Sequence, residues 1–173
     1  YGRLPSLWWN GNVQEQQWES YMDMNNKFAG KIVEVFCTGD TVWIQDIGLL
    51  ILPSFLVRRI RQKMSIGIFI HTPFPSSEIF RTLSVREKLL RGMLNADHIG
   101  FHLYEYARHF IACCRRILGL TIKDRRGGCI LIEYQGREVA VTVAHASIEP
   151  DVVTSRLLVD QTKERLLYFR NKF

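Results

Sequence analysis

The 173-residue sequence lacks most of the motifs that mark a catalytic class. It has no Walker phosphate loop, no Gly-x-Gly-x-x-Gly turn, no Gly-x-Ser-x-Gly elbow and no His-Glu-x-x-His motif. These absences argue against an autonomous nucleotide triphosphatase, a dehydrogenase, an α/β-hydrolase and a zinc protease. The sequence also lacks an apolar run long enough to span a bilayer, and no basic-then-apolar leader opens it. We therefore expect neither a membrane protein nor a signalled secretory one.

Cysteine is scarce, and charge of one sign is not concentrated. The four cysteines form no Cys-x-x-Cys pair, so we expect no zinc site, no other metal site and no redox pair. Buried, reduced thiols in a cytoplasmic protein are the expectation. Lys and Arg number 23 against 17 Asp and Glu, a net charge of +6. As a composition, this excess suits a phosphate-bearing small ligand as well as a nucleic acid. Its spread over several predicted helices argues against a nucleic-acid site.

Helical and strand periodicities alternate along the chain and predict one α/β domain. Helices are predicted over residues 18–36, 49–61, 84–94, 104–118 and 151–170. Strands are predicted over residues 41–46, 65–70, 98–102, 130–134 and 138–143, the last two as a hairpin. Ser76 or Ser77 is a candidate cap for a short helix near Glu78, and Ser84 with Glu87 forms a capping-box pattern. Strand–helix alternation predicts a largely parallel sheet with right-handed crossovers and helices on both faces.

Polar side chains follow three of the predicted strands, namely Asp46, His71 and His102. Ligands of open α/β sheets collect at the carboxyl ends of the strands, where these residues fall. Asp46 either accepts two hydroxyl groups of a sugar or caps the helix that follows it. His71 either donates to a sugar hydroxyl or a phosphate, or bonds the backbone of its own proline-stiffened loop. The residues alone therefore predict an α/β sheet with a polar-ligand cleft.

One long run, Phe69-Ile-His-Thr-Pro-Phe-Pro-Ser-Ser-Glu-Ile-Phe-Arg81, resembles the trehalose-6-phosphate synthases, which are retaining glycosyltransferases. The likeness extends over roughly residues 7–150. Further matching segments are residues 18–21, 25–29, 42–46, 89–94, 95–102 and 106–110. The resemblance implies a two-lobed GT-B enzyme that transfers glucose from UDP-glucose to glucose 6-phosphate without a cofactor. Residues 1–173 then form one incomplete Rossmann-like domain on the acceptor side, without the C-terminal nucleotide-sugar lobe.

The resemblance also implies roles for three residues of this sequence. Asp46 matches the acceptor-binding aspartate, and His71 matches the catalytic-site histidine near the transferred glucose. Trp8 matches a tryptophan that packs on the acceptor sugar, and Trp9 is the alternative to it. By this resemblance the donor-side cations lie outside the chain, so we expect negligible sugar transfer by this chain alone. Its exposed strand edges predict self-association.

The sequence departs from the family pattern around Asp46 and near the C-terminus. The family usually reads His-Asp-Tyr-His where residues 45–48 read Gln-Asp-Ile-Gly. It reads Pro-Ile-Gly-Ile-Asp where residues 145–149 read His-Ala-Ser-Ile-Glu. These changes remove hydrogen-bonding groups from a strand end and a glycine from a turn. They keep a second interpretation open, a non-catalytic regulatory or interaction domain with a degenerate sugar-phosphate cleft.

Overall fold

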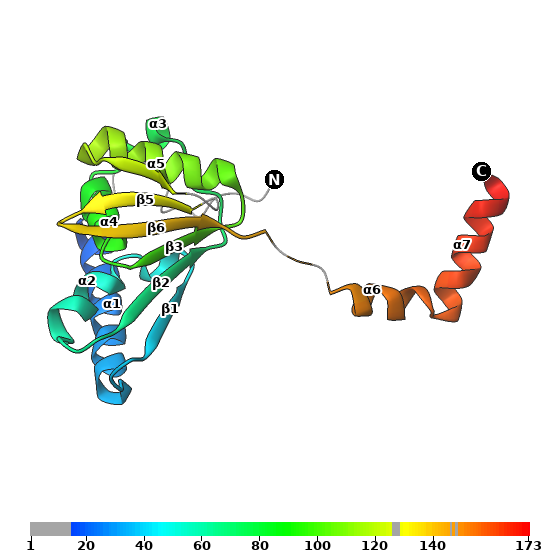
Figure 1. Ribbon diagram of the computed structural model, residues 1–173, viewed down its shortest axis with the longest axis horizontal. Helices are drawn as coiled ribbons and strands as arrows, with labels where there is room; N and C mark the ends of the chain where they lie inside the picture. Colours follow the sequence, from blue (N-terminus) through cyan, green and yellow to red (C-terminus); the bar gives the residue numbers. More distant parts are fainter. Residues whose placement is uncertain (1–14, 126–128, 146, 148) are drawn as a thin grey trace.

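The computed structural model describes residues 15–125, 129–145, 147 and 149–173, and Figure 1 shows a body with a C-terminal arm. Within these described residues the strands of the sheet are β1 (Thr41–Gln45), β2 (Ser65–Ile70), β3 (His98–Phe101), β4 (Ile122–Arg125), β5 (Cys129–Tyr134) and β6 (Arg137–Val143). The helices are α1 (Glu15–Val35), α2 (Leu52–Arg59), α3 (Ser77–Phe80), α4 (Arg86–Met93), α5 (Tyr104–Leu118), α6 (Pro150–Leu157) and α7 (Asp160–Lys172). A 3-10 turn, η2 (Ile47–Leu49), precedes α2.

The sheet is mostly parallel, in the order β1-β2-β3-β6-β5-β4. Strands β1, β2, β3 and β6 are parallel, and β5 and β4 complete the sheet as antiparallel strands. The β5–β6 hairpin turns through Gln135 and Gly136, whose φ angles are both positive (52° and 77°). Positive φ at both central residues matches the twist of two antiparallel strands. The predicted α/β class with flanking helices and a late hairpin is confirmed.

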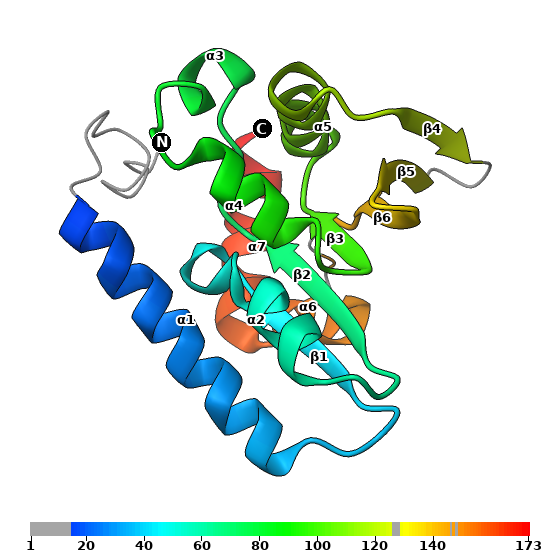
Figure 2. The ribbon, with the colours of Figure 1, turned by 90° about the vertical axis from the view of Figure 1, so that its left-hand side faces the viewer.

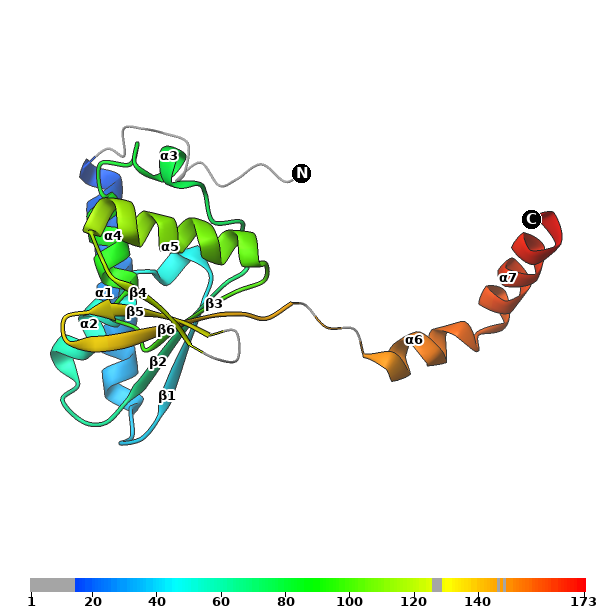
Figure 3. The ribbon, with the colours of Figure 1, turned by 45° about the horizontal axis from the view of Figure 1, so that its top comes forward.

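The helices lie on one face of this sheet. The chain steps from β1 to β2, β3 and β6 in one direction, so right-handed crossovers place every connecting helix on the same side. Figure 2 looks onto this side, with α1, α2 and α4 in front of β1 and β2, and Figure 3 shows α5 over β3 and β6. Ile68 of β2 faces the helices and is 1% exposed, whereas Trp43 of β1 is 69% exposed. The prediction of helices on both faces is therefore wrong for the described residues.

One part of the core is an aromatic cluster beneath α5. It contains Phe74 from the loop after β2, Phe80 from α3, Phe101 from β3 and Phe110 from α5, all at most 2% exposed. Phe74 meets Phe110 edge-to-face with ring centroids 5.4 Å apart, and Phe101 meets Phe110 at 5.5 Å. The cluster joins α3, α5 and β3 to the loop that carries the candidate site.

Several local predictions differ from the structure. Strand β4 is additional, since the sequence pattern predicts no strand there. Helix α4 begins at Arg86 with Val85 as its N-cap and has no side-chain cap, so the capping box at Ser84 is wrong. Ser76 occupies the N-cap position of α3 but makes no side-chain cap bond. The predicted closing helix is two helices, with Val159 in an extended conformation between α6 and α7.

The cysteines are all free thiols, as predicted, but only two are buried. Burial raises the pKa of Cys113 to about 12 and raises that of Cys114 well above its ordinary value. Cys37 is exposed and Cys129 is half-buried, so the prediction of buried thiols holds only for the α5 pair.

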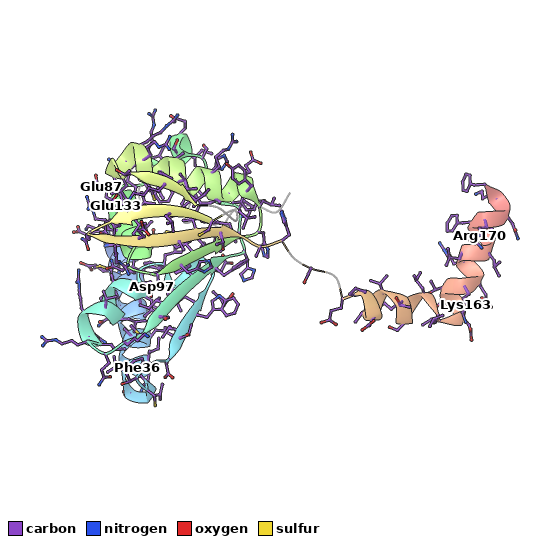
Figure 4. All side chains as sticks on the ribbon, viewed as in Figure 1. Phe36, Glu87, Asp97, Glu133, Lys163 and Arg170 are labelled. Carbon is purple, nitrogen blue, oxygen red and sulfur yellow. The ribbon has the colours of Figure 1, made fainter. Side chains whose placement is uncertain are left out.

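The arm formed by α6 and α7 leaves the body after β6 and contains no buried residue. Figure 4 shows Lys163 and Arg170 on this arm, far from Glu87 and Glu133 of the body. Its exposed apolar side chains include Leu158 at 63% and Phe173 at 96%. Across the described residues, no helix has both the length and the apolar character needed to cross a membrane.

Candidate functional site

The candidate site lies where three parallel strands end side by side. The register pairs Gln45 with Phe69 and Ile70 with Phe101, so the residues that follow β1, β2 and β3 meet at one edge of the sheet. Asp46, His71 and His102 are these following residues. The prediction that they share the carboxyl edge of the sheet is confirmed.

Asp46 is bound to the β2 loop rather than to the helix that follows it. Its φ angle of 57° is uncommon for a residue other than glycine. Its backbone N–H donates to Phe69 O at 2.7 Å, and its carboxylate Oδ1 accepts from Thr72 Oγ1 at 3.0 Å and Thr72 N at 3.4 Å. Although Asp46 occupies the N-cap position of η2, its side chain makes no cap bond. The alternative of a helix-capping aspartate is therefore wrong.

Helix α1 supports the turn that follows Asp46. Tyr21 donates its hydroxyl to Ile47 O at 2.8 Å and accepts from Leu50 N at 2.9 Å. Asn25, which is fully buried, donates its side-chain amide to Gly48 O at 3.3 Å. Burial raises the pKa of Tyr21 to about 12. The position of Asp46 thus depends on side chains from α1 as well as on the sheet.

Replacing Tyr21 with phenylalanine is expected to lower the free energy of unfolding by about 1–3 kcal/mol at neutral pH, because Leu50 N and Ile47 O lose their partner. The Tyr21 pKa is raised on folding. The contribution of its hydroxyl to the free energy of unfolding is therefore complete below about pH 10 and declines as pH rises through about 12. Urea unfolding at about pH 7 and about pH 11 should therefore show that the free energies of unfolding of variant and wild type differ less at the higher pH. An equal difference at both pH values would contradict this assignment. Tyr104→Phe, at a side chain 62% exposed, is the matched control.

His71 is held by side chains on both sides of its ring. Its Nε2 lies 2.8 Å from Gln45 Oε1, and its Nδ1 lies 3.0 Å from His102 Nε2. His102 Nδ1 lies 3.3 Å from Ala144 O, the residue after β6. His71 therefore bonds neighbouring strands, and the alternative of a histidine bonding the backbone of its own loop is wrong.

The ring of Phe69 packs against both imidazole rings. Its ring centroid lies 4.9 Å from each of those of His71 and His102. The ring fits because residue 100 is glycine: a Cβ there would lie 2.6 Å from Phe69 Cδ2. Gly100 thus leaves the space on which the arrangement of the two histidines depends.

The structure describes two of the three predicted site residues, Asp46 and His71. Asp46 and His71 share the edge, but within the described chain no hydrogen bond joins them directly; Asp46 bonds Thr72, the residue after His71. Trp8 and its alternative Trp9 lie outside the described residues. Gln45 and Thr72 were not predicted as site residues, although each is adjacent in sequence to one that was. Within the described residues, no group of three or more His, Cys, Asp or Glu side chains is placed to hold a metal ion.

Comparison with known proteins gives a consistent family assignment. The model of glycosyltransferase family 20 matches residues 3–173. Alpha,alpha-trehalose-phosphate synthase (UDP-forming) 5 of Arabidopsis thaliana is 43% identical over 164 residues, which is 94% of this chain and 19% of that protein. The N-terminal domain of Candida albicans trehalose-6-phosphate phosphatase is 34% identical with a TM-score of 0.75, covering 97% of this chain and 34% of that one.

A trehalose-6-phosphate synthase structure from E. coli bound with UDP-2-fluoro glucose is also similar. It is 26% identical with a TM-score of 0.74, over 86% of this chain and 32% of that one. The chain spans about a fifth of the length of the Arabidopsis relatives that it matches, at 18% to 20% of each.

Proposed function

Because the chain belongs to glycosyltransferase family 20, we propose that it is the acceptor-side part of a trehalose-6-phosphate synthase. The complete enzyme would transfer glucose from UDP-glucose to glucose 6-phosphate. We propose that residues 1–173 form one incomplete Rossmann-like domain of the N-terminal lobe, and that a separate C-terminal lobe supplies the nucleotide-sugar site. The Arabidopsis relatives that it matches are named as UDP-forming synthases, which disfavours the regulatory interpretation.

The observation that carries the proposal is the placement of Asp46 beside the His71 loop at the carboxyl edge. Asp46 Oδ1 is held by Thr72, whereas Oδ2 accepts no hydrogen bond from a residue that the structure describes. A carboxylate fixed by one oxygen leaves the other to accept hydroxyl groups of a sugar. Trp8 is proposed to pack on the same acceptor sugar.

In the proposed reaction this chain positions the acceptor and supplies no nucleophile. A hydroxyl oxygen of glucose 6-phosphate forms a bond to the anomeric carbon of UDP-glucose on the face from which UDP leaves. As the carbon–oxygen bond to UDP breaks, the acceptor proton passes to a phosphate oxygen of the donor. Asp46 would orient the acceptor, and His71 would contact the transferred glucose. Holding the two reactants in the right orientation can by itself lower the barrier to transfer by a large amount.

The site is proposed to bind glucose 6-phosphate in the isolated chain, and isothermal titration calorimetry measures this directly. Asp46→Ala is expected to weaken binding at least about tenfold, since it removes charge-assisted hydrogen bonds to hydroxyl groups. Asp40→Ala is the matched control, because Asp40 accepts from Cys37 N before β1 begins, away from the carboxyl edge. Absence of binding by the wild-type chain, or equal binding by both variants, would contradict the proposal.

Two further proposals concern the state of the protein. The four free thiols support a cytoplasmic location, where cysteines stay reduced. The exposed Trp43 on the edge strand β1 supports self-association, because an edge strand offers unpaired backbone to a second chain.

A further inference from the structure

Four groups from four neighbouring strands form one line of contacts across the carboxyl edge. Gln45 ends β1, His71 follows β2, His102 follows β3 and Ala144 follows β6. The three contacts measure 2.8 Å, 3.0 Å and 3.3 Å in that order. Both nitrogens of His71 are therefore occupied by side chains of this protein, and the family resemblance assigns a role to neither partner.

The chemistry at the two ends of this line constrains its hydrogen atoms. Gln45 Oε1 and Ala144 O are both acceptors, so neither supplies a hydrogen. Two neutral imidazole rings carry two ring hydrogens for these three contacts, and the two shorter contacts, at 2.8 Å and 3.0 Å, are the ones that hold them. His71 Nε2 then donates to Gln45 Oε1, which leaves His71 Nδ1 as an acceptor. His102 Nε2 must donate to it, which leaves His102 Nδ1 without a hydrogen. The contact that lacks a hydrogen in this arrangement is the one to Ala144 O, and at 3.3 Å it is also the longest.

We infer that Gln45 and His102 are positioning residues that hold His71 as its Nε2–H tautomer, and that the Gln45 oxygen sets the direction of every hydrogen bond in the line. This inference rests on the proposed function for one step: an oxygen of the bound sugar takes the Nε2 hydrogen in place of Gln45 Oε1. Gln45 stands where the family usually has a histidine. Its Oε1 thus lies where an oxygen of the bound sugar would lie. Phe69 keeps the two rings at the spacing that the line requires.

Removing the Gln45 side-chain oxygen should reverse the direction of the hydrogen bonds in the line. Without its oxygen, Ala144 O is the remaining acceptor at either end of the line. The favourable arrangement then reverses: His102 Nδ1 donates to Ala144 O, and His71 Nδ1 donates to His102 Nε2. A side chain with a merely structural role would loosen both rings without exchanging their tautomers.

Nitrogen-15 NMR of the imidazole rings reads these tautomers in the full chain without any ligand. At about pH 8, His71 and His102 are expected to show Nε2–H signals. His109 Nδ1 lies 2.9 Å from Phe74 O, a carbonyl, so its ring is expected to be Nδ1–H and serves as an internal reference. An Nδ1–H signal, or a doubly protonated ring, at His71 in the wild-type chain would overturn the inference.

Two substitutions complete the test. Gln45→Leu is expected to convert both His71 and His102 to Nδ1–H, whereas Gln45→Glu, which keeps an oxygen acceptor, retains Nε2–H in both. Unchanged tautomers in a folded Gln45→Leu chain would contradict the inference. If that variant does not fold, the wild-type and Gln45→Glu spectra still decide. The tautomers are read in ligand-free protein, so failure to bind glucose 6-phosphate would overturn the proposed function and leave this result standing.

Discussion

Replacing Phe110 with alanine is expected to lower the free energy of unfolding by about 3–5 kcal/mol, the largest effect of any substitution considered for this protein. Phe110 is fully buried in α5 and contacts Phe74 edge-to-face and Phe101 with tilted rings. Its removal leaves a cavity between α5 and the sheet that the surrounding aromatic rings fill only in part. A typical domain has only about 5–15 kcal/mol of stability, so this loss is a large fraction of the total.

Urea unfolding followed by far-ultraviolet circular dichroism measures the effect. Tyr104→Ala is the matched control, because Tyr104 lies in the same helix, is 62% exposed, and should change stability by less than about 1 kcal/mol. A Phe110→Ala loss no larger than that of the control would show that the aromatic cluster does not hold α5 on the sheet.

Replacing Arg137 with leucine is expected to cost about 2–3 kcal/mol. Arg137 begins β6 and bonds Leu94 O at 2.6 Å, Ala96 O at 3.1 Å and Asp97 Oδ1 at 3.0 Å. Asp97, labelled in Figure 4, also accepts from Ile66 N through Oδ2 at 2.8 Å. One guanidinium therefore joins β6 to the α4–β3 connection and, through Asp97, to β2.

The matched control for Arg137 is Arg108→Leu. Arg108 pairs with Glu105 at 3.7 Å, and both side chains are 63% exposed, so this surface ion pair contributes less than about 1 kcal/mol. Arg137 lies at the amino end of the parallel strands, away from Asp46. Affinity for glucose 6-phosphate in folded Arg137→Leu protein should therefore equal that of the wild type. Equal stability of the two arginine variants in urea would contradict the role given to Arg137.

Much of the fold was predictable because local pattern and tertiary packing agree. Strand β2 and helix α5 have the predicted bounds, since residues 65–70 alternate between the two faces of the sheet and residues 104–118 carry a continuous apolar stripe. Strand β4 was not predicted because three of its four residues, Lys123, Asp124 and Arg125, are charged. Pairing with β5 makes it a strand, and Lys123 forms an ion pair with Glu133 across that pair. The helices lie on one face of the sheet because of the order of the strands, and the local periodicity of the sequence does not encode that order.

The candidate site was predictable only in part, for a related reason. Strand ends are visible in the sequence, so Asp46 and His71 could be placed at one edge. The contacts between Gln45, His71 and His102 depend on the register of three parallel strands, and register is a tertiary property. Thr72 holds Asp46 because the chain is bent at a positive φ, which the residue type permits but does not demand.

The most direct test of the central claim is a backbone amide NMR titration of the chain with glucose 6-phosphate. If the carboxyl edge of β1, β2 and β3 forms a hexose-phosphate wall, the amide signals of Asp46, Thr72 and their immediate neighbours should shift and saturate together. The signals of Arg137 and Asp97, at the amino ends of the parallel strands, should stay in place. Saturable shifts confined to those amino ends, or no shifts at millimolar ligand, would contradict the account.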